Sequence, residues 1–252
     1  VRLGYNGSGE DADVLEFLEA ADPIEIVKKS EKFLTDSENF CEKGIFAFGA
    51  TIEPYKTENC LIPKHPVLMA REAWSKDVDV LIGGTSNEGL IILLPIILEN
   101  DMRAVEILED ERNFTPFVNL MMSVEDKRAE ELGKMLKEVY CGKFFKPSKT
   151  NLNGFIHYHS DLLFWHGIQR AAQSRAAYTD TGKTFLYRFD VNGGLNFFKK
   201  MAKCEDFTGA EHFADCCYLF KSTLQPPPAI DSKDFENIKK TVAIWTSFAI
   251  TG

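Results

Sequence analysis

A short apolar run that ends in two glycines is the feature of this sequence that most constrains its fold. Four of the five residues from Val78 to Ile82 are aliphatic, and Gly83 and Gly84 follow directly. Such a run is typical of a strand buried on both faces of a parallel sheet, and the glycines mark where the chain turns off its carboxyl end. Because parallel strands are joined by crossover segments that are usually helical, the run predicts an α/β architecture.

Helical and strand patterns alternate along the rest of the chain, which favours helices packed against a mostly parallel sheet. Residues 183–190 place aromatic residues on one face and predict the second strand. Over residues 125–140 an amphipathic helix is expected, with one face formed by Ala129, Leu132, Leu136 and Val139. Further helices are expected over 11–34 with a break at Asp22-Pro23, after His65-Pro66, from Ser160-Asp161, and from Asp231 or Ser232 onward. Only two strands stand out, so we expect the partner strands to lie upstream of this sequence.

Two polar residues follow short apolar stretches and are the candidate catalytic residues. Glu88 lies in Gly-Gly-Thr-Ser-Asn-Glu-Gly (83–89), and His212 lies in Gly-Ala-Glu-His-Phe-Ala-Asp (209–215). An acid followed later by a histidine is the order that α/β-hydrolases use after their nucleophilic serine. No Gly-x-Ser-x-Gly occurs in the 252 residues, and Ser86 is rejected as the nucleophile because Glu88 occupies the place of the second glycine.

Five segments occur in the order found in one known family. They are Leu-Ile-Pro-Lys-His-Pro (61–66), Gly-Thr-Ser-Asn-Glu-Gly (84–89), Phe-Leu-Tyr-Arg-Phe-Asp (185–190), Gly-Ala-Glu-His (209–212) with Tyr-Leu-Phe (218–220), and Trp-Thr-Ser-Phe-Ala-Ile-Thr-Gly (245–252). In these segments the chain resembles the type-B carboxylesterases, and within them insect alpha-esterases. The resemblance implies an α/β-hydrolase fold. It also implies that residues 1–252 form the carboxyl-terminal portion of a single domain, with the nucleophile-bearing amino-terminal half outside this sequence.

The resemblance also implies a reaction. Glu88 matches the acid and His212 the histidine of a Ser-His-Glu triad that hydrolyses a small-molecule carboxylic ester through an acyl-serine intermediate, without metal or organic cofactor. The chain alone is then expected to be inactive. Two alternatives stay open: a catalytically inactive, cholinesterase-like adhesion or binding domain, and a short chain that is itself the natural product. The presence of both Glu88 and His212 favours the enzyme.

The sequence around the histidine departs from the family's pattern in two places. Glu211 precedes His212 where a small residue is more usual, and Phe213-Ala214 follows where an alanine and an acid are common. A carboxylate beside the histidine would favour the positively charged form of the imidazole. We therefore expect the departure to affect the pH dependence of the reaction more than its class.

Composition and charge exclude several other classes of protein. A net charge of −9 disfavours nucleic-acid partners, and the longest apolar run, Leu90 to Leu98, falls far short of the ~20 residues that span a bilayer. The six cysteines lack a C-x-x-C spacing, which disfavours a zinc site. Their even number leaves disulfides open, but buried free thiols are favoured, and a helix after the histidine loop is expected to bury at least one of Cys216 and Cys217. Helix packing or exposure, rather than metal binding, is the favoured interpretation of three neighbouring histidines: His157, His159 and His166. The sequence leaves the compartment and the oligomeric state open.

Overall fold

The computed structural model describes residues 3–31, 49–54, 56–69, 77–92, 106, 109–123, 125–146, 151–204 and 207–252. They fall into two compact units, Val1–Thr51 with Pro116–Ala129 and Ile52–Thr115 with Glu130–Gly252. Of the helix expected after His65-Pro66, the structure describes α4 (Pro66–Met69), and its continuation to Trp74 lies outside the described residues. Both candidate catalytic residues belong to the second unit.

The first unit contains the pair of helices predicted near the start of the chain. They are α1 (Asp11–Ala20) and α2 (Pro23–Glu31), and the same unit includes α7 (Phe117–Leu120). The carboxylate of Asp22 accepts a hydrogen bond from the N–H of Ile24 at 2.9 Å, as an N-cap does, and Pro23 takes the first helical position. The predicted break between the two helices is therefore confirmed.

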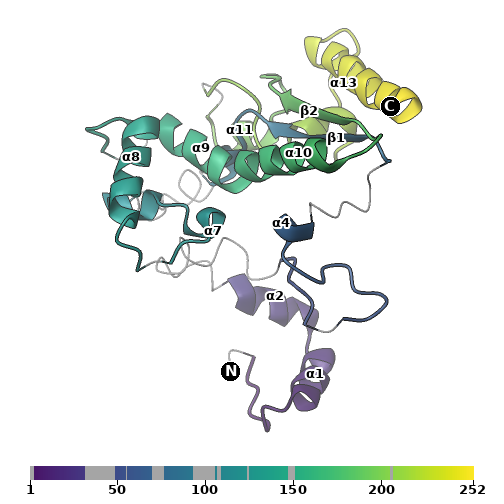
Figure 1. Cartoon of the computed structure of the whole chain (residues 1–252). Coiled ribbons are helices and arrows are strands. Elements are labelled where there is room, and N and C mark those ends of the chain that lie inside the picture. The colour runs from purple at the N-terminus through teal and green to yellow at the C-terminus, as the bar shows by residue number, and fades with distance from the viewer. Residues whose placement is uncertain are drawn as a thin grey trace. The chain divides into compact units, whose positions relative to one another are not determined.

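The second unit is organised around a parallel pair of strands, β1 (Val80–Thr85) and β2 (Thr184–Phe189). Their register runs from Val80 opposite Thr184 to Thr85 opposite Phe189. Between them in sequence lies α10 (His166–Tyr178), which packs along both strands (Figure 1). Both predicted strands are confirmed, and this parallel pair with its crossover helix is the arrangement expected of an α/β protein. The predicted end of the first strand is wrong, because Gly83 and Gly84 lie within β1 and the chain turns only after Thr85.

The helix expected to begin at Ser160-Asp161 begins earlier, so that prediction was wrong. One continuous helical run comprises α9 (Asn153–Ser160), the π-helical segment η5 (Asp161–Trp165) and α10. Neither polar side chain caps a helix, since the hydroxyl of Ser160 donates to the carbonyl of Ile156 at 2.7 Å and the carboxylate of Asp161 accepts from the hydroxyl of Tyr140 at 2.7 Å. A Ser-Asp pair is typical of a helix start, but here Ser160 bonds back to the preceding turn of its own helix and Asp161 to Tyr140 of α8, so both groups are satisfied inside the run.

Two other predicted helices are confirmed with small adjustments. One is α8 (Ala129–Cys141), whose apolar face holds buried Ala129, whereas Val139 is 77% exposed and does not join that face. The other is α13 (Lys233–Thr251), whose N-cap is Ser232; the Ser232 hydroxyl accepts from the N–H of Phe235 at 3.2 Å. Ring contacts attach α13 to β2, with Trp245 4.8 Å from Tyr187 and Phe248 5.8 Å from Phe185.

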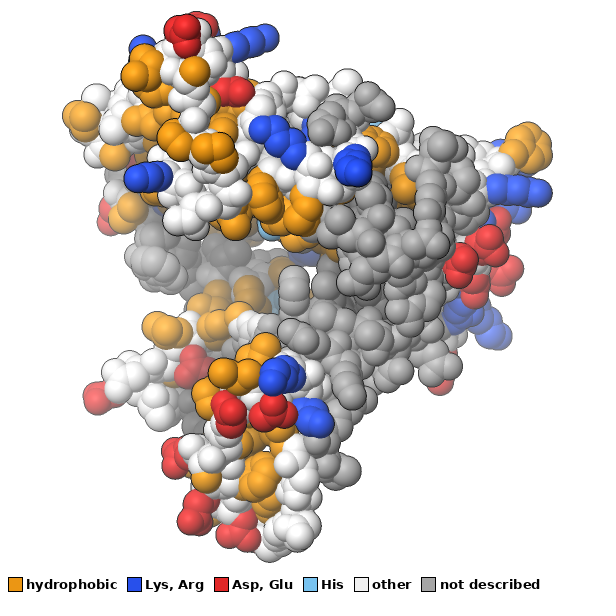
Figure 2. Space-filling view, turned by 180° about the vertical axis from the view of Figure 1, so that it is seen from behind, with side chains coloured by type: hydrophobic (Ala, Val, Ile, Leu, Met, Phe, Trp, Pro, Cys, Tyr) orange, Lys and Arg blue, Asp and Glu red, His pale blue; other side chains and the backbone are white. Residues whose placement is uncertain are grey.

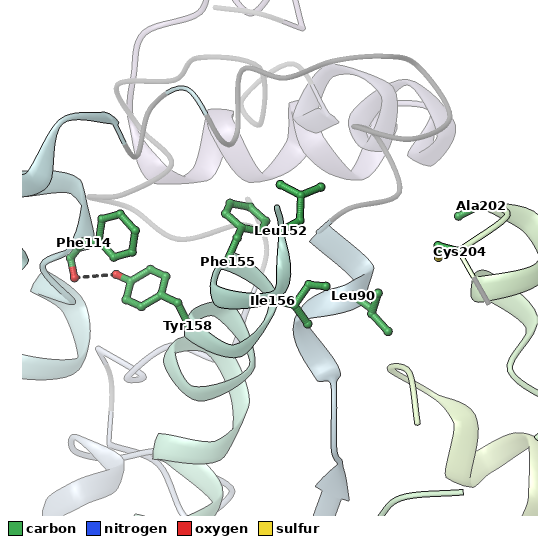
Figure 3. Close-up of a cluster of buried hydrophobic side chains, with 8 residues drawn as sticks. All are labelled: Leu90, Phe114, Leu152, Phe155, Ile156, Tyr158, Ala202 and Cys204. Atoms are coloured by element: carbon green, nitrogen blue, oxygen red, sulfur yellow. Dashed lines mark hydrogen bonds between the residues drawn. The ribbon is translucent and has the colours of Figure 1, made fainter. Parts of the chain in front are cut away.

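Two buried apolar clusters support the ends of the two strands. The first joins α9 to the segment after β1 and contains Leu90, Phe114, Leu152, Phe155, Ile156, Tyr158, Ala202 and Cys204 (Figure 3). Figure 3 shows Leu90 beside Ile156, and the hydroxyl of Tyr158 donating to the carbonyl of Phe114 at 2.7 Å. The second lies beside β2 and contains Phe189, Leu195, Ala210, Ala214, Cys217 and Tyr218. Leu90 closely follows Glu88, while Ala210 and Ala214 flank His212, so both candidate residues sit directly on the core.

The surface of the described residues is mixed in character. Figure 2 shows acidic and basic side chains scattered among hydrophobic ones on the face that it draws. Apolar residues of α13 remain exposed, among them Ile244 (58%) and Ile250 (81%). Within the described part of the chain, no helix combines the length and the apolar character needed to cross a membrane.

Candidate active site

Glu88 is positioned by the tight turn that follows β1. After Thr85 the chain enters the short 3-10 helix η2 (Glu88–Ile92), and Glu88 is 5% exposed. Its Oε1 accepts a hydrogen bond from the backbone N–H of Thr85 at 2.7 Å, which fixes the carboxylate at the carboxyl end of the strand. The N–H of the next residue, Gly89, donates to the hydroxyl of Ser160 in α9 at 2.8 Å. The turn is therefore attached to α9 by this hydrogen bond.

The histidine loop is joined to this turn along its backbone. Asn87 and Glu211 form an isolated parallel bridge beyond the ends of β1 and β2, with the N–H of Asn87 donating to the carbonyl of Ala210 at 2.9 Å. The hydroxyl of Ser86 accepts from the N–H of Ala210 at 2.8 Å. Ser86 is 5% exposed and holds the two loops together. This structural role disfavours Ser86 as a nucleophile.

The structure brings the two predicted residues into direct contact. Nδ1 of His212 lies 2.5 Å from Oε2 of Glu88. The side chain of Glu88 is 6% exposed and that of His212 is 32% exposed, so the carboxylate is enclosed while the imidazole reaches the surface of the described residues. The ring of Phe164, from the π-helical segment, lies 5.0 Å from the imidazole, centroid to centroid.

This arrangement selects the nitrogen that is free to react. A carboxylate at Nδ1 favours the tautomer in which Nδ1 carries the proton, which leaves Nε2 as the proton acceptor. The buried carboxylate also stabilises the imidazolium that forms when Nε2 takes up a proton, and its low-dielectric surroundings strengthen that interaction. The pair can therefore accept and return one proton.

The remaining histidines are arranged differently. His157 and His166 are exposed, whereas His159 is 1% exposed and packs 4.1 Å from the ring of Phe155. Nδ1 of His159 lies 2.9 Å from the carbonyl of Phe155, and burial lowers the pKa of His159 to about 4. Across the described ranges, no three His, Cys, Asp or Glu side chains gather as they would around a metal ion.

The cysteines that the structure describes are free thiols, as predicted, and Cys41 lies outside the described residues. In α12 (Ala214–Leu219), directly after the histidine, Cys217 is buried and Cys216 is partly buried, which confirms the expectation that one of them packs in a helix. Burial raises the pKa of Cys217 to about 11 and also raises that of Cys216. Both thiols are thus kept protonated, which disfavours a nucleophilic role.

Three buried polar residues around the histidine loop were not predicted: Asn196, Lys199 and Glu211. Each is no more than 2% exposed. The sequence marked Glu211 only as an unusual neighbour of His212, and a lysine in a Phe-Phe-Lys-Lys segment carries no signal of burial. Their partners are mainly backbone groups of a loop that the sequence does not delimit.

Beyond the carboxyl ends of two parallel strands, an acid and a histidine meet, as they do in the α/β-hydrolase class of protein. The model of the carboxylesterase family matches residues 1–252, and the chain belongs to that family. The family resemblance and the α/β-hydrolase fold inferred from the sequence are both confirmed. Over 254 residues the chain is 36% identical to Esterase B1 of Culex pipiens, an alignment that covers 99% of this chain and 45% of that protein. The chain thus spans a little under half the length of this relative.

Proposed function

We propose that this chain supplies the acid and the histidine of a Ser-His-Glu triad in a carboxylic ester hydrolase. The observation that carries the proposal is the 2.5 Å contact between Glu88, in the turn after β1, and His212, in the loop that is bridged to that turn. Membership of the carboxylesterase family supports the reaction class, and the related protein of Culex pipiens is called an esterase. The serine and the oxyanion loop come from a part of the protein outside this sequence.

His212 acts twice in the proposed reaction. Its Nε2 first accepts the proton of the attacking serine and passes it to the leaving alcohol, and the acyl group remains on the serine. Nε2 then takes a proton from water, which attacks the acyl carbon, and returns that proton to the serine as the acid leaves. Glu88 keeps the imidazole in the productive tautomer and stabilises its charged form without becoming protonated. The substrate is a small-molecule carboxylic ester, and the reaction needs neither metal nor organic cofactor.

The 252 residues alone should not hydrolyse esters. They contain no Gly-x-Ser-x-Gly, and Ser86 is buried in a structural hydrogen bond. Loss of the nucleophile from a serine protease triad costs about 10⁶ in turnover. Serine-dependent turnover by the purified chain would contradict this part of the proposal.

A fluorophosphonate probe applied to the source tissue tests the function, because it labels only an activated serine. Labelled protein is isolated, its peptides are matched to this sequence, and its intact mass is measured. A labelled species of roughly twice 28.5 kDa that contains these peptides is the expected result. An unlabelled species of that mass would favour the inactive binding domain, and an unlabelled protein near 28.5 kDa would mean that the short chain is natural and inactive.

A further inference from the structure

Two buried, oppositely charged residues behind the histidine loop each bind backbone groups of the segment that carries the other. Glu211 directly precedes His212, and its two carboxylate oxygens accept the N–H groups of Phe198 (2.8 Å) and Lys199 (2.5 Å) at the start of α11 (Phe197–Met201). In the opposite direction, Nζ of Lys199 donates to the carbonyls of Phe207 and Gly209 in the histidine loop. Glu211 thus attaches the histidine loop to the start of α11, and Lys199 of α11 binds the histidine loop in return.

Asn196 adds a third set of hydrogen bonds, which includes one to Glu211, the residue next to His212. Its side-chain oxygen accepts from the backbone N–H of Glu211 at 3.0 Å. Its amide donates to the carbonyls of Val191 (3.0 Å) and Gly193 (2.9 Å), which follow β2. Glu211 is therefore fixed through both its side chain and its backbone.

Burying two charged groups to anchor a loop carries a desolvation cost in free energy. Burial raises the pKa of Glu211 and lowers that of Lys199, so each group resists being charged where it lies. The hydrogen bonds to backbone amides and carbonyls offset part of that cost, but an apolar pair of similar volume would achieve the same packing without it. What an apolar pair would lack is the directional attachment of the loop to α11 and of α11 to the loop.

The loop is held from its other side by the turn after β1. Ser86 binds the N–H of Ala210, and Asn87 donates to the carbonyl of Thr208. Backbone groups from Phe207 to Glu211 are thus bound between the acid-bearing turn and α11. His212 follows immediately, so a displacement of this segment would be transmitted to the imidazole.

We propose that Lys199 and Glu211 are positioning residues that hold the loop of His212 in register with Glu88. The proposal rests on the function proposed above, in which His212 is the catalytic base. Neither residue touches the reacting atoms in this scheme, and both act through the backbone of the loop. A misplacement of a catalytic group by about 1 Å can cost about 10²-fold in rate, so the expected effect on turnover is large.

The test uses Lys199→Met, Glu211→Gln and the double variant in the complete protein that contains this chain. Lys200→Met is the matched control, because Lys200 is exposed on the same short helix. Each single variant leaves one buried charge without its counterpart and should lower stability, whereas the double variant removes both charges and should regain much of it. The double variant is therefore the decisive one, since it is expected to fold.

Two measurements separate positioning from mere stability. The proton shared by His212 and Glu88 is followed as a low-field imidazole N–H resonance, assigned by its absence from His212→Gln, and ester hydrolysis gives kcat and KM. In the double variant we expect the resonance to be lost or shifted and kcat to fall by about 10²-fold with KM within about twofold, while Lys200→Met matches wild type. A stable double variant that keeps the resonance and the wild-type kcat would overturn the proposal. If the resonance responds as expected but the wild-type protein hydrolyses no ester, the proposed function fails and the positioning role stands.

Discussion

Oε2 of Glu88 lies 2.5 Å from Nδ1 of His212, although 124 positions separate the two residues in the sequence. The distance is set by the sheet. The parallel register places Thr85 opposite Phe189, and a separate isolated bridge pairs Asn87, just beyond β1, with Glu211 in the histidine loop. Since each candidate residue follows a bridge partner by one position, any change in the pairing of the strands would separate the carboxylate from the imidazole.

Replacing Glu88 by glutamine should abolish most turnover without unfolding the protein. An amide beside Nδ1 favours the wrong imidazole tautomer, and in a serine protease triad the equivalent change costs about 10⁴ in kcat. Glutamine retains an oxygen that can accept the N–H of Thr85, the bond that orients the wild-type carboxylate. Steady-state ester hydrolysis by the complete protein measures the effect.

Glu130→Gln is the matched control for this substitution, because Glu130 is an exposed acid in the first turn of α8. It should leave kcat and KM unchanged. Were Glu88→Gln to retain turnover within tenfold of wild type, Glu88 would not be the acid of the triad.

Ser86→Ala should destabilise the protein while leaving its nucleophile intact. The substitution removes the acceptor of the buried N–H of Ala210, and an unsatisfied buried donor costs about 1–3 kcal/mol. Fluorophosphonate labelling of the complete protein should persist, and the midpoint of urea unfolding should fall. A fluorophosphonate adduct found on Ser86 itself in the labelled wild-type protein would identify Ser86 as the reactive serine and contradict the structural role.

The parts of the fold that could be predicted are those with local signals. The apolar run of β1, the aromatic alternation in β2 and the cap at Asp22 each specify a conformation within a few residues, and each prediction is confirmed. The end of β1 was predicted wrongly, because Gly83 and Gly84 pair with Tyr187 and Arg188 inside the strand. Ser160 was misassigned as a helix start because its partner, the N–H of Gly89, lies 71 positions away. In a sequence, a short polar side chain indicates a helix cap even when its hydrogen-bond partner lies far away along the chain.

The residues of the candidate site also differ in whether a local sequence signal marks them. Glu88 and His212 could be predicted because they stand in glycine-containing segments in the order acid and then histidine, a pattern with a chemical precedent. The short apolar strand expected directly before His212 is absent from the described residues, since β2 ends at Phe189. Lys199 and Glu211 could not, since both bind backbone groups, and backbone groups leave no trace in a sequence. Phe164 was assigned to no role because its contact with the imidazole depends on the π-helical segment, whose wider turn the pattern does not predict.

Two glycines near the site should respond oppositely to alanine. A Cβ at Gly89 would lie 2.2 Å from the carbonyl oxygen of Ile156 and 2.8 Å from the backbone nitrogen of Ser160, so η2 or α9 must shift. Overpacking of this kind costs about 1–3 kcal/mol. A Cβ at Gly167 in α10 would meet nothing within 4 Å, and there alanine should stabilise the helix by roughly 0.5–1 kcal/mol. Urea unfolding of both variants measures the difference, and equal effects would show that the close packing of η2 on α9 is not rigid.

Acidification should lower the stability of the protein, because the buried imidazole of His159 resists protonation in the folded state. Its pKa is about 4 in the folded protein against an ordinary value of 6.5, because burial disfavours the charged imidazole. The unfolded chain therefore binds a proton more readily between these values. The stability that the neutral imidazole contributes is complete above pH 6.5 and is lost as the pH falls toward 4, to a total of about 3 kcal/mol, of which about 2 kcal/mol is lost by pH 5.

Urea unfolding at pH 7.5 and pH 5 tests this dependence in the wild-type protein, His159→Gln and His157→Gln. The side chain of His157 is exposed on the same helix, so its substitution should preserve the wild-type loss of stability between the two pH values. In His159→Gln that loss should be smaller by about 2 kcal/mol, because glutamine does not titrate. The comparison concerns the change with pH, so a uniform destabilisation of His159→Gln does not affect it. An undiminished loss in His159→Gln would assign the acid sensitivity to other groups.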